Sequence, residues 1–119
     1  MNTFNVNQNG VVTNPMCDTI LDIKHTYRLD ITYAEIDGVF HFGHKCSSNI
    51  KGLGYSLGAS PCSIFREIGS LDAAKAYLID IEIKSLTFWQ INKKAKCDDI
   101  IKKLKDVRNT LIFKQLTIF

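Results

Sequence analysis

The sequence of 119 residues lacks several features that would place it in a class at once. No apolar run approaches the roughly 18 residues needed to span a bilayer, and the polar, asparagine-rich first residues do not resemble a secretory signal peptide. The four cysteines are widely spaced, with no C-x-x-C pair, which favours reduced thiols over a disulfide framework. We therefore expect a cytoplasmic protein of one domain that has no membrane segment.

The chain has little net charge, but the charge is unevenly distributed. The composition is ordinary, with 45% apolar and 23% charged residues and a net charge of +3. Residues 1–70 carry five Lys/Arg and six Asp/Glu, a balance of −1, whereas residues 93–119 carry eight Lys/Arg and three Asp, a balance of +5. A basic segment attracts an anionic ligand or nucleic acid, although a solvated helix face gives the same pattern.

The first half of the chain predicts a small antiparallel sheet. Apolar and polar residues alternate from Leu21 to Tyr33, the period of a half-buried strand. Asp37-Gly38 is a two-residue hairpin signal, since glycine accepts the positive φ that a type I′ turn demands, and residues 39–44 return as the second strand. Residues 47–63 are rich in glycine and serine and predict a long loop, followed by a short strand at 64–68.

The second half predicts two helices. Ser70 is a good N-cap for a helix from Leu71 to about Gln90, whose broad apolar surface suggests contact with the sheet and with another helix or subunit. A second helix begins at Asp98 or Asp99 and leads to an apolar tail. This order predicts an α+β fold, with both helices on one face of an antiparallel sheet. The single domain comprises a polar lead (1–18), the sheet with its loop (19–68) and the helices with the tail (70–119).

The stretch from Gly54 to Gly58, GYSLG, matches the G-x-S-x-G pattern of serine hydrolases. In those enzymes a strand delivers the serine to a sharp turn before a helix, and an acid and a histidine follow in the chain. Here the surroundings of Ser56 predict a loop, and all three histidines precede it, so we reject a hydrolase. Bare backbone amides and hydroxyl groups can still approach an anion closely. Gly58 and Ser60 are therefore candidate ligand contacts, with an ordinary surface loop as the alternative.

The sequence predicts no metal, no cofactor and no catalysis. His41, His44 and Cys46 are close together, but in a strand His41 points away from the other two unless a bulge forms near Gly43, and no fourth ligand is evident. Carboxylates are scattered, and none is combined with a nucleophile or a base. A binding or interaction protein is the better class.

The end of the first predicted helix combines residue types that bind nucleotides. Phe88, Trp89 and Asn92 lie close together, a lysine-rich segment (93–105) follows, and Arg108 lies on the next helix. An aromatic ring stacks on a base, asparagine pairs with the edge of a base, and a cation holds phosphate. The alternative for Phe88 is a place in the core, because it falls on the main apolar stripe.

Three short stretches give the chain a resemblance to a known family: FHFG at residues 40–43, GASP at 58–61 and DAAKA at 72–76. Together with the hairpin and the two C-terminal helices, they resemble the small phage proteins that sequester the signal of the Thoeris defence system. The resemblance implies a non-enzymatic sponge for cyclic ADP-ribose isomers or cyclic dinucleotides, with pockets between the subunits of a homo-oligomer. Such pockets use an aromatic residue on the base, asparagine for polar contacts and arginine on phosphate. The residues of matching type here are Phe88 or Trp89, Asn92, Arg66 and Arg108.

Two other functions stay open at this point. The lysine-rich segment 93–105 is suited to the phosphates of nucleic acid, in which case binding falls steeply with salt. A protein–protein inhibitor that uses an exposed helix face is the third hypothesis. We rank the cyclic-nucleotide sponge first, nucleic-acid binding second and an enzyme last.

Overall fold

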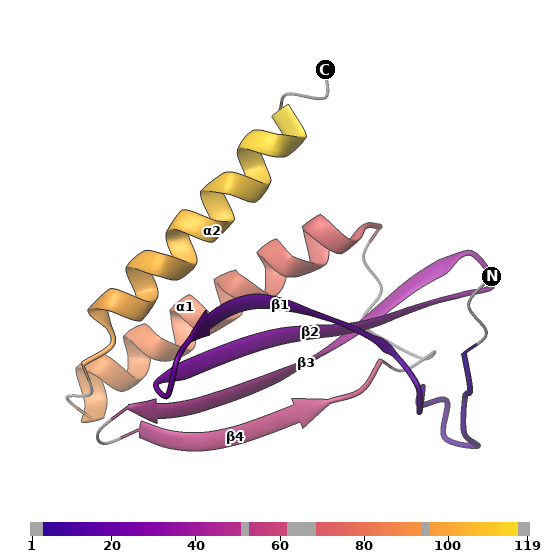
Figure 1. Ribbon diagram of the computed structural model, residues 1–119, viewed down its shortest axis with the longest axis horizontal. Helices are drawn as coiled ribbons and strands as arrows, with labels where there is room; N and C mark the ends of the chain where they lie inside the picture. The colour runs from indigo at the N-terminus through magenta and orange to yellow at the C-terminus, as the bar shows by residue number, and fades with distance from the viewer. Residues whose placement is uncertain (1–3, 51–52, 62–68, 94–95, 117–119) are drawn as a thin grey trace.

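The computed structural model describes residues 4–50, 53–61, 69–93 and 96–116, which form four strands followed by two helices (Figure 1). The elements are β1 (Met16–Ile23), β2 (Tyr27–Ile36), β3 (Val39–Ile50), β4 (Leu53–Ala59), α1 (Leu71–Lys93) and α2 (Asp98–Leu116). The strands are antiparallel in the order β1-β2-β3-β4. Helix α1 packs over β2 and β3 and α2 over β1, which confirms the predicted α+β fold.

The predicted hairpin turn is confirmed. Ile36 pairs with Val39 at the end of the β2–β3 ladder, and Asp37 and Gly38 between them have φ angles of 52° and 79°. Two central residues with positive φ define the turn that matches the twist of the flanking strands. The sequence signal was sufficient because this conformation is a local property of the two residues.

The prediction of one continuous strand from residue 21 to residue 33 is wrong. A turn divides it, with His25 at a φ of 64° and the Thr26 amide donating to the carbonyl of Ile23 at 2.9 Å. Ile23 and Tyr27 face each other across the β1–β2 pair, so their side chains lie on the same face of the sheet. The alternation of apolar residues therefore continues through the turn without a break, and neither glycine nor proline marks it.

The prediction of a long loop at residues 47–63 is also wrong. Strand β3 continues to Ile50, and β4 pairs with it from Ile50↔Leu53 to His44↔Ala59. Glycine and serine are poor strand formers in isolation, but pairing with a neighbouring strand overrides such preferences. Alternation of apolar and small residues in LGYSLGA was a signal of this strand. The strand predicted at 64–68 lies outside the described residues.

Both helices begin where the sequence predicts. The Ser70 hydroxyl accepts a hydrogen bond from the Ala73 amide at 3.2 Å, the N-cap arrangement, and α2 begins at Asp98. The apolar stripe that the sequence predicts on α1 includes Ala74, Leu78, Ile81 and Phe88. Ala74 and Leu78 are buried, as are Ile79 and Leu86 beside the stripe, whereas Ile81 and Phe88 are 42% and 56% exposed. No helix in the described residues is both long and apolar enough to cross a membrane.

The face of the sheet opposite the helices is covered in part by the chain that leaves β4. The Thr32 hydroxyl donates to the carbonyl of Ala59 at 3.2 Å, and the amide of the fully buried Val12 donates to the carbonyl of Pro61 at 2.8 Å. Gly43 pairs with Thr32, so it lies where the segment Ala59–Pro61 crosses this face of the sheet. A Cβ atom at Gly43 would lie against the backbone of Ala59 and Ser60.

Gly43→Ala is therefore expected to lower the free energy of unfolding by about 2–3 kcal/mol, because backbone must move to admit the methyl group. Gly54→Ala is the matched control on β4, since a Cβ there meets no atom closer than 3.8 Å. Urea unfolding of the two variants measures the difference. Equal stability of the two variants would show that the backbone of Ala59 and Ser60 is not closely packed against Gly43.

Candidate functional site

The structure brings Phe88, Trp89 and Asn92 together at the C-terminal end of α1. Phe88 is 56% exposed, so its alternative placement in the core is wrong. Its ring meets Trp89 edge-on, with ring centroids 5.3 Å apart and planes at 80°, and Trp89 is half-buried against the core. The Asn92 Nδ2 donates to the carbonyl of Phe88 at 2.8 Å. This bond holds the amide nitrogen on the backbone one helical turn before it, and the Asn92 side chain is itself exposed.

Arg108 does not join these residues within one chain. Its Nε donates to Asp80 Oδ1 at 2.6 Å, and both side chains are partly exposed. Asp80 precedes Asn92 by twelve residues on the same helix, a separation of about 18 Å along the axis. The pair lies where α2 packs on α1, and the guanidinium already has an anionic partner.

Gly58 and Ser60 lie elsewhere. Gly58 pairs with Lys45, on the face of the sheet opposite the helices, and Ser60 is exposed just after β4. This face carries a shallow hollow of about 440 Å³, which Gly58 lines together with Arg28 and Lys45. Arg28 there contacts Asp30 at 3.0 Å and Asp22 at 3.7 Å. Arg66, the remaining predicted contact, lies outside the described residues.

The basic segment is on the surface. Lys96, Lys102, Lys103 and Lys105 are all exposed at the start of α2 and along it. Among the described residues these four form no ion pair, since the salt bridges there use Arg28, Lys75 and Arg108. These exposed lysines can bind an anion. A solvated helix face without a ligand would show the same exposure.

His41, His44 and Cys46 do not converge. The β2–β3 register runs through Gly43 without a shift, so strand alternation places His41 on one face and the other two on the opposite face. His41 is 3% exposed, and its Nδ1 has no hydrogen-bond partner. The part of the chain that the structure describes holds no group of three or more metal-ligating side chains close enough to share an ion.

A buried carboxylate is the feature that sequence reasoning missed. Glu82 of α1 is 7% exposed and faces the sheet. Its Oε1 accepts hydrogen bonds from Tyr27 Oη at 2.6 Å, from Cys46 Sγ at 3.2 Å and from Tyr55 Oη at 3.5 Å, one donor from each of β2, β3 and β4. A signal existed, because Glu82 lies four residues from Leu78 and from Leu86 on one helical row, and both leucines are buried.

The three donors around Glu82 stay protonated at neutral pH. Burial, together with the nearby Glu82 carboxylate, raises the pKa of the Cys46 thiol to about 12 and raises the pKa of both tyrosines, Tyr27 and Tyr55, above the ordinary phenolic value. A nucleophilic cysteine needs the thiolate form, and burial works against it here. The cluster is suited to holding α1 on the sheet rather than to covalent chemistry.

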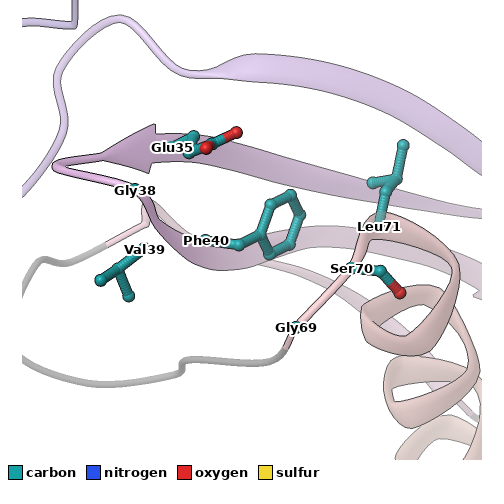
Figure 2. Close-up of a pocket in the computed structure, with 7 residues that line it drawn as sticks. All are labelled: Glu35, Gly38, Val39, Phe40, Gly69, Ser70 and Leu71. Atoms are coloured by element: carbon teal, nitrogen blue, oxygen red, sulfur yellow. The ribbon is translucent and has the colours of Figure 1, made fainter.

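A cavity of about 580 Å³ lies between the β2–β3 turn and the first turn of α1. Figure 2 shows the Phe40 ring between the strand that carries Glu35 and the start of the helix at Leu71. Phe40 also stacks on Tyr33, with centroids 5.6 Å apart. The one charged side chain among the described lining residues is that of Glu35, which disfavours an anionic ligand.

Fold and site together define an α+β protein with an exposed aromatic and amide surface at the end of one helix. A search for similar proteins found no matching family model, no similar curated protein and no similar solved structure. The function is therefore inferred from the residues described above.

Proposed function

We propose that this chain is a non-enzymatic binding protein that sequesters a cyclic nucleotide signal, either a cyclic ADP-ribose isomer or a cyclic dinucleotide. It acts in the cytosol of a host cell as a phage counter-defence protein. Tight binding lowers the free concentration of the signal and so silences its receptor. The protein works as a homo-oligomer, and a second subunit completes the binding site.

The observation that carries the proposal is the exposure of Phe88 beside Asn92. A large aromatic side chain left 56% exposed is available to stack on a base, a contact worth about 1–3 kcal/mol. The adjacent amide can accept from the edge of that base. Phosphates require cations nearby, and because Arg108 is engaged with Asp80, we assign this role to the exposed lysines of the segment 93–105 or to a neighbouring subunit.

Calorimetric titration against a panel of ligands tests the proposal. The panel contains cyclic ADP-ribose isomers, cyclic dinucleotides, linear ADP-ribose and a short DNA duplex. We expect tight, stoichiometric binding of one cyclic compound, which is recovered intact after the protein is denatured. Conversion of the compound would contradict the non-enzymatic role, and lack of binding to every nucleotide would overturn the proposal.

Phe88→Leu is expected to weaken binding of that compound about 5- to 150-fold, which corresponds to the loss of one stacked base. Tyr77→Leu is the matched control, since Tyr77 is a 47% exposed aromatic residue on the same helix, eleven residues or about 16 Å away. Titration of both variants separates local stacking from a general effect on α1. If both substitutions change affinity equally, Phe88 is not in the site.

A second candidate function is favoured by the exposed lysines of α2. Nucleic-acid binding through Lys102, Lys103 and Lys105 would depend steeply on salt, with a slope close to the number of phosphate contacts. A closed pocket for a small nucleotide depends on salt far less. Duplex binding that disappears in salt, with no binding of any cyclic nucleotide, would favour this second function.

A further inference from the structure

The two edges of the sheet are protected to very different degrees. Exposed strand edges attract other strands, and proteins usually guard them with charges, proline, bulges or short length. Edge strand β1 is guarded: it carries Asp18 and Asp22 and has a bulge between Thr19 and Leu21. Edge strand β4, LGYSLGA, has seven residues with no charge and no proline, and its register with β3 is regular.

Most of strand β4 is also exposed, as far as the described residues show. Gly54 and residues 56–59 are exposed, and Leu57 is 54% exposed. Figure 1 shows β4 at the edge of the sheet remote from α2. Every second residue of an edge strand directs its backbone N–H and C=O groups away from the sheet, so β4 presents a row of hydrogen-bonding groups.

The sequence of β4 is self-complementary about Ser56. If a second β4 pairs antiparallel with the first, with Ser56 opposite Ser56, then Tyr55 lies opposite Leu57 and Gly54 lies opposite Gly58 on both sides of the axis. Leu57 pairs with Cys46 and the Tyr55 hydroxyl reaches Glu82, so both side chains lie on the helix face of the sheet. An aromatic residue opposite an aliphatic one is a favourable cross-strand pair, and it would cover Leu57.

We propose that a second copy of this chain pairs along β4, with a two-fold axis at Ser56, to form a continuous eight-stranded sheet. A two-fold interface uses the same patch on both subunits, which the near-palindrome GYSLG satisfies. Strand β4 carries no charged residue, so no like charges face each other across the axis. Gly54 and Gly58 have no side chain that would hinder the backbone of the second copy. The five residues from Gly54 to Gly58, which pair with one another across the axis, span about 17 Å, a short contact for a specific complex. We therefore expect a dimer that dissociates at micromolar concentration.

This proposal does not rest on the proposed ligand. It also gives the stretch GYSLG a structural role in place of the hydrolase role that its pattern suggests. The dimer brings the helix face of β4 and α1 of one copy beside the same face of the other. A homo-oligomer is thus expected even if no nucleotide binds.

Charge placed at the axis tests the register directly. Ser56→Lys and Ser56→Glu each put two like charges opposite one another, about 5 Å apart at Cβ, and each variant alone should dimerise at least about tenfold more weakly than the wild type. An equimolar mixture of the two variants should regain the wild-type dissociation constant or better. Sedimentation equilibrium over a range of protein concentrations measures all of these.

Ser47→Lys and Ser47→Glu are the matched controls. Ser47 pairs with Ser56 from β3, is exposed and lies on the same face of the sheet. Across the proposed axis the two Ser47 positions are three strand spacings apart, about 14 Å, beyond the screening length of about 8 Å at physiological salt. These variants should dimerise like the wild type.

Three results would overturn the proposal. Equal effects at positions 47 and 56, or a mixture that fails to restore the dimer, would exclude the axis at Ser56. If the protein stays monomeric at every concentration up to the millimolar range, a second copy does not pair with β4. The partner of this edge would then be an extended segment of another protein.

Discussion

Replacing Glu82 with alanine is expected to lower the free energy of unfolding by about 3–5 kcal/mol, among the largest effects of any single substitution in this protein. The carboxylate accepts from Tyr27, Cys46 and Tyr55, so its removal leaves these donors without their acceptor. Tyr27 and Cys46 are each 2% exposed and cannot turn to solvent. An unsatisfied buried donor costs about 1–3 kcal/mol.

Chemical denaturation of three variants measures this effect. Glu82→Gln keeps one acceptor oxygen and should lose less stability than Glu82→Ala. Asp80→Ala is the matched control on the same helix, since its ion pair with Arg108 is partly exposed and such pairs contribute about 0–1 kcal/mol. If Glu82→Ala costs no more than Asp80→Ala, the buried cluster does not anchor α1 to the sheet.

Alkaline pH is expected to destabilise the protein through the same cluster. The pKa of Cys46 is raised from 9.0 to about 12 in the folded protein, mainly by burial and next by Glu82. Between these values the unfolded chain releases the thiol proton while the folded chain retains it, so the unfolded state is favoured as pH rises. The stability that Cys46 contributes is complete below about pH 9 and falls above it by about 1.4 kcal/mol per pH unit. The raised pKa of Tyr27 acts in the same direction.

Urea unfolding at a series of pH values from 7 to 11 tests this prediction. Cys46→Ala should make the decline above pH 9 shallower by about 1.4 kcal/mol per pH unit, whatever its effect at neutral pH. Cys17→Ala is the matched control, because Cys17 is an exposed thiol on β1. An identical alkaline slope in the wild type and in Cys46→Ala would show that the folded protein does not hold this proton.

Helix α1 explains why the predicted ligand residues could be only partly located from the sequence. Its apolar residues occur on nearly all sides, so periodicity alone did not show which side the sheet and α2 would cover. The structure places Glu82 toward the sheet and Asp80 toward α2, which leaves Phe88 on the third side. The proximity of Phe88, Trp89 and Asn92 follows from helical spacing alone, whereas the position of Arg108 depends on how two helices pack.

Features that depend only on neighbouring residues could be predicted from the sequence. These are the turn at Asp37-Gly38, the cap at Ser70, the start of α2 at Asp98 and the α+β order of the elements. Positive φ at a turn and hydroxyl capping of a helix are local energies, so a few residues specify them.

The tertiary structure was needed for the features that depend on distant residues. It made a strand of the glycine-rich stretch Leu53–Ala59, because β3 supplies the hydrogen bonds that the segment cannot make alone. It divided the predicted strand at His25, where the apolar alternation crosses a turn unchanged. It also gathered Tyr27, Cys46 and Tyr55 from three strands around Glu82 of α1. Contacts between residues far apart in the chain form only when the whole fold does, and they leave no periodic pattern in the sequence.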